Sequence, residues 1–321
     1  DGGDGRFKPD LVAPGTHVQA GIPQNNYAGN TVCNKYWPGI STLYGWSSGT
    51  SHAAPAVAGG AALVYQHFLN QNLKAPSPAM IKAFLMNSAT HMTGSEANDT
   101  LPSSNQGMGR LDLGRAFDGV PRVVVDQSEL LTETGQVFRV SGSVVRSDQP
   151  FRVTLAWSDA PGAIVGSPVV NDLHLEVTIN GQTYKGNVFS GATSIPNGIA
   201  DNKNNIESVF LPAGISGSFT VTVTAANLTG DGVPNSGGTL DQDFALVVYN
   251  GSKTPPPVVT LNPTSLNFTA TLGGATPAAQ TINLTNTGGG ALTWSATDDA
   301  TWLSVTPGNG AAPATLTASV N

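Results

Sequence analysis

The sequence has 321 residues, of which 39% are hydrophobic, so it is long enough for two or three domains with cores of their own. Only 11% of the residues are charged and the net charge is -7 at pH 7, which argues against attraction to phosphate backbones and anionic membranes. We therefore expect no nucleic-acid partner and no membrane partner. Cys33 is the only cysteine, which excludes an intramolecular disulfide and a cysteine-rich metal site, and we expect it to pack in or under a loop.

The first predicted helix runs from Ser51 to about Leu69. Small and apolar residues recur there at spacings of three and four, which is the pattern of an amphipathic helix with a closely packing alanine and glycine face. These residues are Ala54, Val57, Ala58, Ala61, Val64 and Phe68. Ser77 followed by Pro78 predicts the N-cap and first position of a second helix. We expect the two helices to form a hairpin.

A serine stands at the start of the first helix, within residues 49–60 (GTSHAAPAVAGG). One interpretation is that Thr50 or Ser51 only caps the helix, as Ser and Thr often do. The other is catalytic, because a helix N-terminus offers unpaired backbone N–H groups and the positive end of the helix dipole, which stabilise developing negative charge. A serine there can attack a carbonyl while its own N–H helps to hold the oxyanion.

Residues 49–60 resemble the nucleophile motif of the subtilisin-like (subtilase) serine peptidases, in which glycine, threonine and serine precede small residues, a proline and valine-alanine-glycine. Residues 4–15 (DGRFKPDLVAPG) are similar to the loop and strand that precede the nucleophile in that family. Residues 105–112 (NQGMGRLD) are similar to the glycine-rich turn that closes its catalytic domain. The resemblance covers residues 1–119, which would be the C-terminal part of an α/β peptidase domain.

This resemblance implies that Ser51 is the nucleophile, that the Ser51 backbone N–H contributes to the oxyanion site, and that the Thr50 hydroxyl lies nearby. We expect Ser48 and Gly49 to contact the substrate, and no cofactor is implied for catalysis. In this family the serine works with a histidine base and an aspartate that orients it. Neither partner is expected within this sequence, whose two ends we expect to be truncated, so we expect the chain alone to be inactive.

Two histidines close to the motif are not expected to act as the base. Residues 15–18 (GTHV) mimic the histidine motif of the family, but they follow residues 8–10, and the catalytic histidine of the family lies far upstream of that point. We therefore interpret His17 as a loop residue. His52 adjoins Ser51, but successive helical residues project about 100° apart, so we interpret His52 as structural. The isolated histidines, interpreted as ordinary polar residues, are His67, His91 and His174.

From Val123 the period of the hydrophobic pattern changes to two. Runs bounded by Gly, Pro, Asn or Asp predict about eight short strands in a sandwich or jelly roll over residues 120–250. The clearest runs are 151–157, 173–179, 219–225 and 244–248. Residues 153–161 (VTLAWSDAP) and 170–173 (VNDL) resemble the C-terminal jelly roll of oxidatively stable alkaline subtilases.

Domains of this kind often hold calcium, which takes about six to eight oxygen ligands. Asp159, Asp172 and Asp201 fall in predicted strand-end loops and are candidate ligands of a structural calcium ion. The alternative is that Asp and Asn simply favour turns. His174, two residues after Asp172, departs from a more acidic form of the motif.

Residues 251–258 contain three consecutive prolines, which favour an extended and semi-rigid linker. Beyond it, residues 259–321 alternate again, with strands expected at 266–268, 282–284 and 292–294. Residues 300–307 (ATWLSVTP) resemble part of the small Ig-like modules found at the ends of secreted bacterial hydrolases. We expect a partial Ig-like module that binds a surface or polymer, or spaces domains.

The sequence thus predicts a multi-domain protein with an α/β subtilisin-like fragment, an all-β jelly-roll sandwich and a partial all-β Ig-like module. As part of a full-length parent it is expected to be a secreted, monomeric serine endopeptidase that acts on proteins or peptides. The alternative is a non-catalytic secreted binding or adhesive protein with a degenerate peptidase region. The polar, weakly charged composition favours secretion.

Position 52 gives a first testable prediction. The family resembled by this sequence usually has methionine there, and its oxidation to a sulfoxide beside the nucleophile is impossible with His52. We expect the active parent protein to retain its activity in hydrogen peroxide, measured as residual peptidase activity after exposure. Rapid inactivation with His52 chemically unmodified would contradict this.

Overall fold

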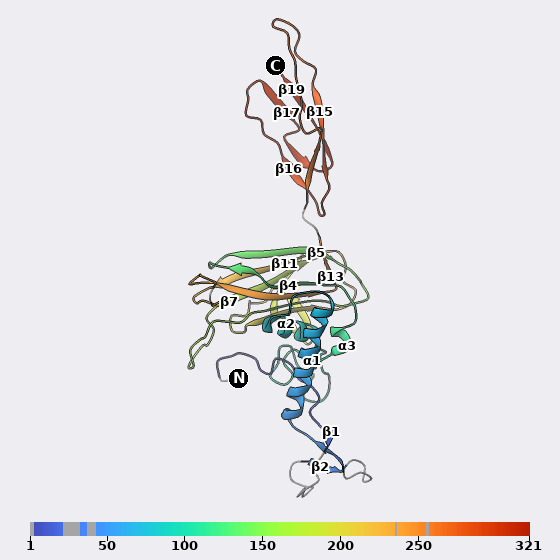
Figure 1. The fold of residues 1–321 in the computed structure, drawn as a ribbon, viewed down its shortest axis with the longest axis vertical. Coiled ribbons are helices and arrows are strands. Elements are labelled where there is room, and N and C mark those ends of the chain that lie inside the picture. The colour runs from blue at the N-terminus through green and yellow to red at the C-terminus, as the bar shows by residue number, and fades with distance from the viewer. Residues whose placement is uncertain (1–2, 22–32, 37–42, 235, 255–256) are drawn as a thin grey trace. The chain divides into compact units, whose positions relative to one another are not determined.

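The computed structural model describes residues 3–21, 33–36, 43–234, 236–254 and 257–321, with the backbone alone for residues 33–36. The packing predicted for the Cys33 side chain therefore lies outside the described residues. The chain forms two compact units, Asp1–Ser252 and Lys253–Asn321 (Figure 1). The division falls within the predicted linker at 251–258, and residues 1–119 and 120–250 share the first unit.

The first unit begins with a small sheet and two helices. Strands β1 (Val18–Gly21), β2 (Cys33–Tyr36) and β3 (Tyr44–Ser47) pair antiparallel, with β3 in the centre. Helices α1 (Thr50–Asn70) and α2 (Pro78–Ser88) confirm the two predicted helices, and the short helix α3 (Leu113–Ala116) follows. The Ser77 side chain caps α2 as expected, since it accepts a hydrogen bond from the Met80 amide at 3.0 Å.

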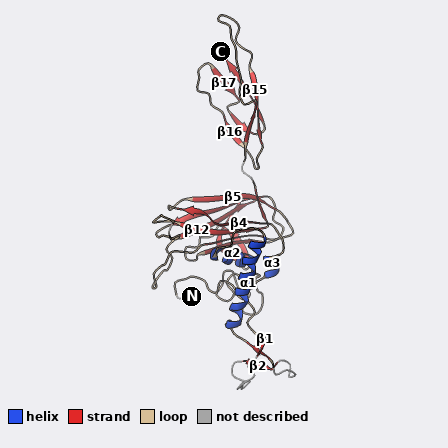
Figure 2. Ribbon diagram, in the orientation of Figure 1, coloured by secondary structure: helices blue, strands red, loops and turns tan. Residues whose placement is uncertain are grey.

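Ten described strands assemble into two further sheets (Figure 2). Nine of them lie within residues 120–250, where about eight were expected, and the tenth, β13, lies within residues 251–258. One sheet has the order β10-β6-β12-β4 and the other has the order β13-β5-β11-β7-β8-β9. Their bounds are β4 (Arg122–Leu131), β5 (Val137–Val144), β6 (Phe151–Ala156), β7 (Asp172–Ile179), β8 (Gln182–Ser190), β9 (Thr193–Pro196), β10 (Ile206–Leu211), β11 (Ser218–Asn227), β12 (Gln242–Tyr249) and β13 (Gly251–Lys253). The four clearest runs of the sequence lie on β6, β7, β11 and β12.

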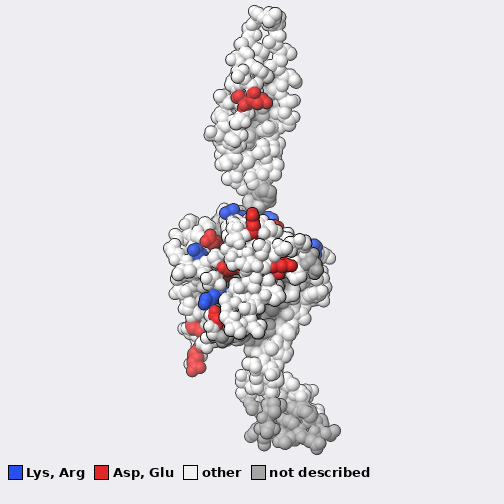
Figure 3. Space-filling view, turned by 90° about the vertical axis from the view of Figure 1, so that its left-hand side faces the viewer, with Lys and Arg blue, Asp and Glu red and all other residues white. Residues whose placement is uncertain are grey.

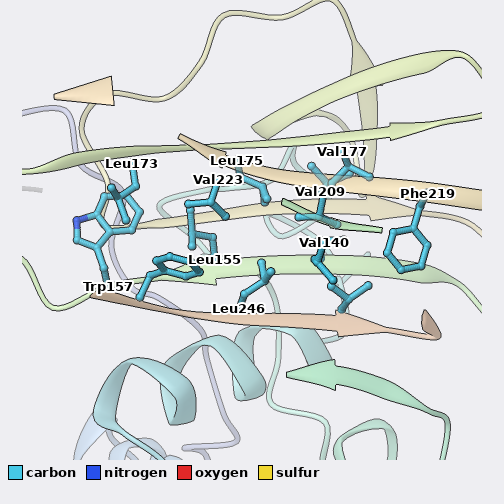
Figure 4. Packing of buried hydrophobic residues seen from close by; sticks show 14 of the residues in the cluster. Val140, Leu155, Trp157, Leu173, Leu175, Val177, Val209, Phe219, Val223 and Leu246 are labelled. Carbon is cyan, nitrogen blue, oxygen red and sulfur yellow. The ribbon is translucent and has the colours of Figure 1, made fainter. Parts of the chain in front are cut away.

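The alternating residues of these runs fill the space between the two sheets (Figure 4). Leu155 and Leu246 come from the four-stranded sheet, and Leu175 and Val223 come from the six-stranded sheet. All four are at most 1% exposed and belong to one buried cluster. The period of two in the sequence therefore arises because one side of each strand faces this shared core.

Strand β12 is buried along its whole length because its sheet is covered on both faces. Phe244, Leu246 and Val248 face the cluster between the sheets. Ala245 and Val247 belong instead to a second cluster, which also contains Met80, Ala83 and Phe84 of α2. A strand covered on both sides has an almost continuous apolar sequence rather than a strict alternation.

Two arginines join the C-terminal end of α2 to its surroundings. Arg152 on β6 donates from Nη1 to the carbonyls of Asn87 (3.1 Å) and Ala89 (2.7 Å). Arg115 donates to the carbonyls of Ser88 (3.2 Å) and Ala89 (2.9 Å). These carbonyls carry the negative end of the helix dipole, so both cations are favourably placed. Burial, with the like charge of Arg115 as a smaller cause, lowers the pKa of Arg152 to about 9.

The second unit contains a four-stranded sheet, β14-β15-β19-β17, and the pair β16-β18. The bounds are β14 (Val259–Asn262), β15 (Gln280–Asn286), β16 (Thr293–Ser295), β17 (Leu303–Thr306), β18 (Asn309–Ala311) and β19 (Ala314–Val320). The strand expected at 266–268 is wrong: the Asn267 carbonyl accepts from the Gln280 side chain at 2.7 Å, and no strand pairs with this segment in the described part of the unit. Among the described residues of this unit, the buried apolar ones are Leu284, Leu316 and Ala318.

The surface carries few charges, as the composition predicts, and Figure 3 shows isolated acidic and basic side chains on a largely uncharged face. In the described part of the chain, no helix combines the length and apolarity that crossing a membrane requires.

Glu207 on β10 is a carboxyl group inside the first unit, with 0% of the residue exposed. Its Oε2 accepts a hydrogen bond from the Leu175 amide at 2.7 Å, whereas its buried Oε1 has no partner among the described residues. Burial raises the pKa of Glu207 well above the ordinary value of 4.5, and repulsion from Asp201, Asp172 and Glu176 acts in the same direction. The folded protein therefore favours the neutral acid.

Replacing Glu207 by glutamine tests whether the raised pKa makes the free energy of unfolding depend on pH, because glutamine has a similar shape and cannot ionise. The unfolded natural chain releases the Glu207 proton above about pH 4.5 while the folded state retains it, so this group lowers the free energy of unfolding as the pH rises from there toward the raised pKa. Relative to the natural protein, we expect Glu207→Gln to be more stable at pH 7 than at pH 4 by at least about 1 kcal/mol. Urea unfolding at both pH values measures the difference, and a difference independent of pH would contradict the assignment.

Candidate active site

Ser51 lies in the first turn of α1, just after the chain leaves β3. Gly49 is the N-cap residue with an extended backbone (φ 162°, ψ 162°), and Thr50 is the first helical residue. Thr50 and Ser51 are both exposed. The serine therefore stands at a helix start as the sequence predicted, while its catalytic role stays a prediction.

The start of α1 leaves backbone donors open. No side-chain hydrogen bond caps this helix, and its first turn holds no acidic residue. The His52 amide donates to the Gly49 carbonyl at 3.0 Å, but the amides of Thr50 and Ser51 have no partner among the described residues. Two free N–H groups at the positive end of a helix dipole can stabilise an oxyanion that forms beside Ser51.

The turn before α1 is anchored to residues 15–17. The Gly49 amide donates to the Gly15 carbonyl at 2.7 Å, and the His17 amide donates to Ser48 Oγ at 2.9 Å. The His17 ring also meets the Trp46 ring edge to face, with centroids 5.2 Å apart. Ser48 and Gly49, predicted to contact substrate, thus also hold the turn in place.

The fold brings together the three segments that the sequence singled out. Residue Val12, from residues 4–15, forms a parallel bridge with Arg110, from residues 105–112. The Met108 amide also donates to the Asp10 carbonyl at 2.9 Å. Gly107 has a φ of +59°, and a Cβ there would lie 2.3 Å from the Asp10 carbonyl oxygen, so this turn requires glycine. Through Gly15, the same segment reaches the turn that carries Ser51.

The structure shows the contacts of each histidine. His17 has a φ of +53° in the loop before β1, and its ring contacts Trp46. His52 Nε2 lies 2.7 Å from Ser47 Oγ. Neither histidine hydrogen-bonds to Ser51 within the described chain. The remaining contacts are those of His67 with aromatic rings, His91 with the Asp99 carbonyl and His174 with Asp172.

The three candidate calcium ligands are held by protein groups. Asp159 accepts from the amides of Val170 (2.9 Å) and Asn171 (2.8 Å). Burial raises the pKa of Asp159. Asp201 accepts from the Lys203 amide at 2.9 Å and the Asn187 side chain at 2.7 Å.

Asp172 Oδ2 lies 3.2 Å from His174 Nε2, while its buried Oδ1 has no partner in the described chain. Among the described residues, no group of three or more His, Cys, Asp or Glu side chains is arranged to hold a metal ion. Calcium binding stays a prediction.

A mainly apolar groove of about 530 Å³ runs beside Thr50. Leu11 and Ala13 line one part of it, and Ala53 and Val57 of α1 line another. The sequence pattern did not predict this groove, because its walls come from segments about 40 residues apart that tertiary contacts such as the Gly15 to Gly49 hydrogen bond bring together.

Comparison with known families agrees with this geometry. Residues 2–109 match the family model described as the subtilase family, peptidase S8. The match includes residues 4–15 and 49–60 and the beginning of residues 105–112. It supports the placement of this segment of the chain in the subtilase family.

Two curated relatives carry related names. The chain is 25% identical over 279 residues to the serine protease/ABC transporter B family protein tagA of Dictyostelium discoideum, covering 78% of this chain and 15% of the relative. It is 34% identical over 133 residues to the subtilisin-like protease SBT3 of Solanum lycopersicum, covering 38% of this chain and 16% of the relative. The chain thus spans about a sixth of the length of these relatives, and their names support a function related to serine proteases.

The second unit has a family match of its own. Residues 258–321 match the family model described as the viral BACON domain. The match covers the segment expected to be a partial Ig-like module and does not confirm the Ig-like assignment.

Gly15 gives a test of the anchor at the turn. A Cβ at Gly15 would lie 2.8 Å from the Gly49 carbonyl oxygen and 3.3 Å from Ala53 Cβ, so alanine must push the turn away. We expect Gly15→Ala to lower the free energy of unfolding of the first unit by about 1–3 kcal/mol, measured by urea unfolding.

Gly59→Ala is the matched control, because a Cβ at Gly59 on α1 meets nothing within 4 Å. Alanine is the better helix former, so this variant is expected to gain about 0.5–1 kcal/mol. If Gly15→Ala unfolds at the same urea concentration as the natural protein, the close contact is not part of the fold.

Proposed function

We propose that the protein is a secreted subtilisin-like serine endopeptidase with Ser51 as its nucleophile. The observation that carries the proposal is the position of Ser51 at a helix start with open amides, inside the segment that matches the subtilase family. A serine that only caps a helix stands at the N-cap position, whereas Gly49 is the N-cap here and Ser51 is the second helical residue.

In the proposed reaction, Ser51 Oγ attacks the carbonyl carbon of a peptide bond and its proton passes to a histidine. The tetrahedral oxyanion accepts a hydrogen bond from the Ser51 amide, and the Thr50 hydroxyl would assist as a further donor. The histidine then protonates the leaving amine as the C–N bond breaks, and water hydrolyses the resulting ester.

The histidine, and the aspartate that orients it, would be supplied by a part of the protein outside these 321 residues. Loss of the base from a triad lowers the rate by about 10⁴-fold or more. The chain alone would therefore be nearly inactive, although it contains the nucleophile.

The proposal extends to the other parts of the chain. The sandwich would be a jelly roll like that of oxidatively stable alkaline subtilases, with Asp159, Asp172 and Asp201 as ligands of a structural calcium ion. The second unit would be a small Ig-like accessory module. The partner would be a protein or peptide substrate, bound by a monomer without nucleic acid or membrane.

The rival function is a binding or adhesive protein with a degenerate peptidase region. The observation in its favour is that no histidine or carboxylate hydrogen-bonds to Ser51 in the described part of the chain. In that case Ser51 would be only the second residue of a helix.

Fluorophosphonate labelling of the full-length protein separates the two functions. The reagent labels a serine only where a base activates it, so we expect labelling in the natural protein and none in Ser51→Ala. Ser128→Ala, which changes an exposed serine on β4, is the matched control and is expected to label normally. Absence of labelling in the folded natural protein, or labelling that persists in Ser51→Ala, would favour the rival function.

A further inference from the structure

The contact between His52 and Ser47 spans the residues that carry the proposed chemistry. His52 Nε2 and Ser47 Oγ are 2.7 Å apart, which is a short hydrogen bond in which either tautomer of the ring can take part. The bond closes a small ring of chain that contains Ser48, Gly49, Thr50 and Ser51. The bond therefore restrains this segment between the end of β3 and the first turn of α1.

Ser47 is a fixed point for such a contact. It is the last residue of β3, the central strand of its sheet, and it is paired with Val18 on β1 and Cys33 on β2. Backbone ladders thus restrain it from both sides. The side chain of His52 extends this restraint from the sheet to the first turn of α1.

The His52 ring reaches Ser47 by folding back beside Gly49. A Cβ built on Gly49 would lie 4.0 Å from His52 Cδ2 and 3.8 Å from the Ser51 amide nitrogen, so the ring and the amide flank the same residue. Gly49 has no side chain and is extended, and it supplies only backbone contacts to hold the turn. Of the side-chain hydrogen bonds described here, that of His52 ties the first turn of α1 to β3.

We propose that His52 is a positioning residue, which acts through Ser47 to hold the first turn of α1 so that the Ser51 hydroxyl and the open amides stay aligned. This inference rests on the proposed function of Ser51. His52 does not serve as the base in this role, because its Nε2 is engaged by Ser47 and the ring folds along Gly49. It replaces the restraint that a side-chain cap would give without occupying the amides that the oxyanion needs.

The test compares variants that remove the contact with one that retains it. His52→Met keeps an unbranched side chain of similar length without a strong hydrogen-bonding group, and Ser47→Ala removes the partner. His52→Gln places an amide within reach of Ser47 Oγ. We expect the second-order rate of fluorophosphonate labelling to fall about tenfold in His52→Met and in Ser47→Ala, to fall no further in the double variant, and to recover in His52→Gln.

His67→Gln is the control at the other end of α1, where the ring contacts aromatic side chains, and it is expected to label like the natural protein. With a peptide substrate, misalignment predicts a lower kcat at an unchanged KM, whereas general unfolding would lower the active fraction in every variant of the turn, including His52→Gln. Labelling of His52→Met within twofold of the natural rate would overturn the inference.

Hydrogen exchange of the backbone amides of residues 48–52 measures how readily the turn opens, and it does not depend on catalytic activity. We expect faster exchange in His52→Met and Ser47→Ala and natural exchange in His52→Gln. If the natural protein does not label at all, the proposed function fails. Unchanged exchange in His52→Met would show separately that the contact does not hold the turn.

Discussion

The sheet β10-β6-β12-β4 is buried on both faces, and the arrangement of the first unit depends on this constraint. Burial of polar groups is costly unless they are hydrogen-bonded, and several polar side chains on the α2 side bond to one another. Asn87 on α2 donates to Thr154 Oγ1 at 3.1 Å, and Thr154 shares a hydrogen bond of 3.0 Å with Ser208. Arg152 on β6 donates to the Ala89 carbonyl and so connects the C-terminal end of α2 to the same sheet. The helices and the sandwich therefore share one compact unit, Asp1–Ser252.

Residues 4–15 connect these contacts between α2 and the sandwich to the turn that carries Ser51. The Phe7 amide donates to Asn204 Oδ1 at 3.0 Å, in a loop of the sandwich. Lys82 on α2 lies 3.2 Å from Asp10 Oδ1 and bonds to the Asn205 side chain at the same distance. The segment is thus held by both the sandwich and α2 before it arrives at Gly15 and the Gly49 amide. Elements far from Ser51 in sequence contribute to the geometry around it.

Local patterns in the sequence predicted the local structure well. The spacing from Ser51 to Leu69 predicted α1, Ser77 predicted the cap of α2, and the alternating runs predicted four strands of the sandwich. Contacts between distant segments could not be predicted from the sequence and were identified only in the structure. The bond from Gly49 to Gly15, the burial of Glu207 and the occupation of Asp201 by protein donors depend on tertiary packing, which periodicity does not encode. Residues 266–268 show the converse, since alternation without a neighbouring strand does not make a strand.

The first turn of α1 has no capping side chain, which lowers the stability of the helix but leaves its amides open for the proposed reaction. A capping side chain at position 49, or an acidic residue at position 50 or 52, would stabilise a helix of this kind by about 0.5–2 kcal/mol. The same group would occupy or neutralise the amides on which the proposed chemistry depends. Changes that stabilise a protein often reduce its activity where function needs an open or strained site. In this 21-residue helix, which contains no Asp, Glu, Lys or Arg, the uncapped start is therefore a point where stability and the proposed chemistry make opposite demands.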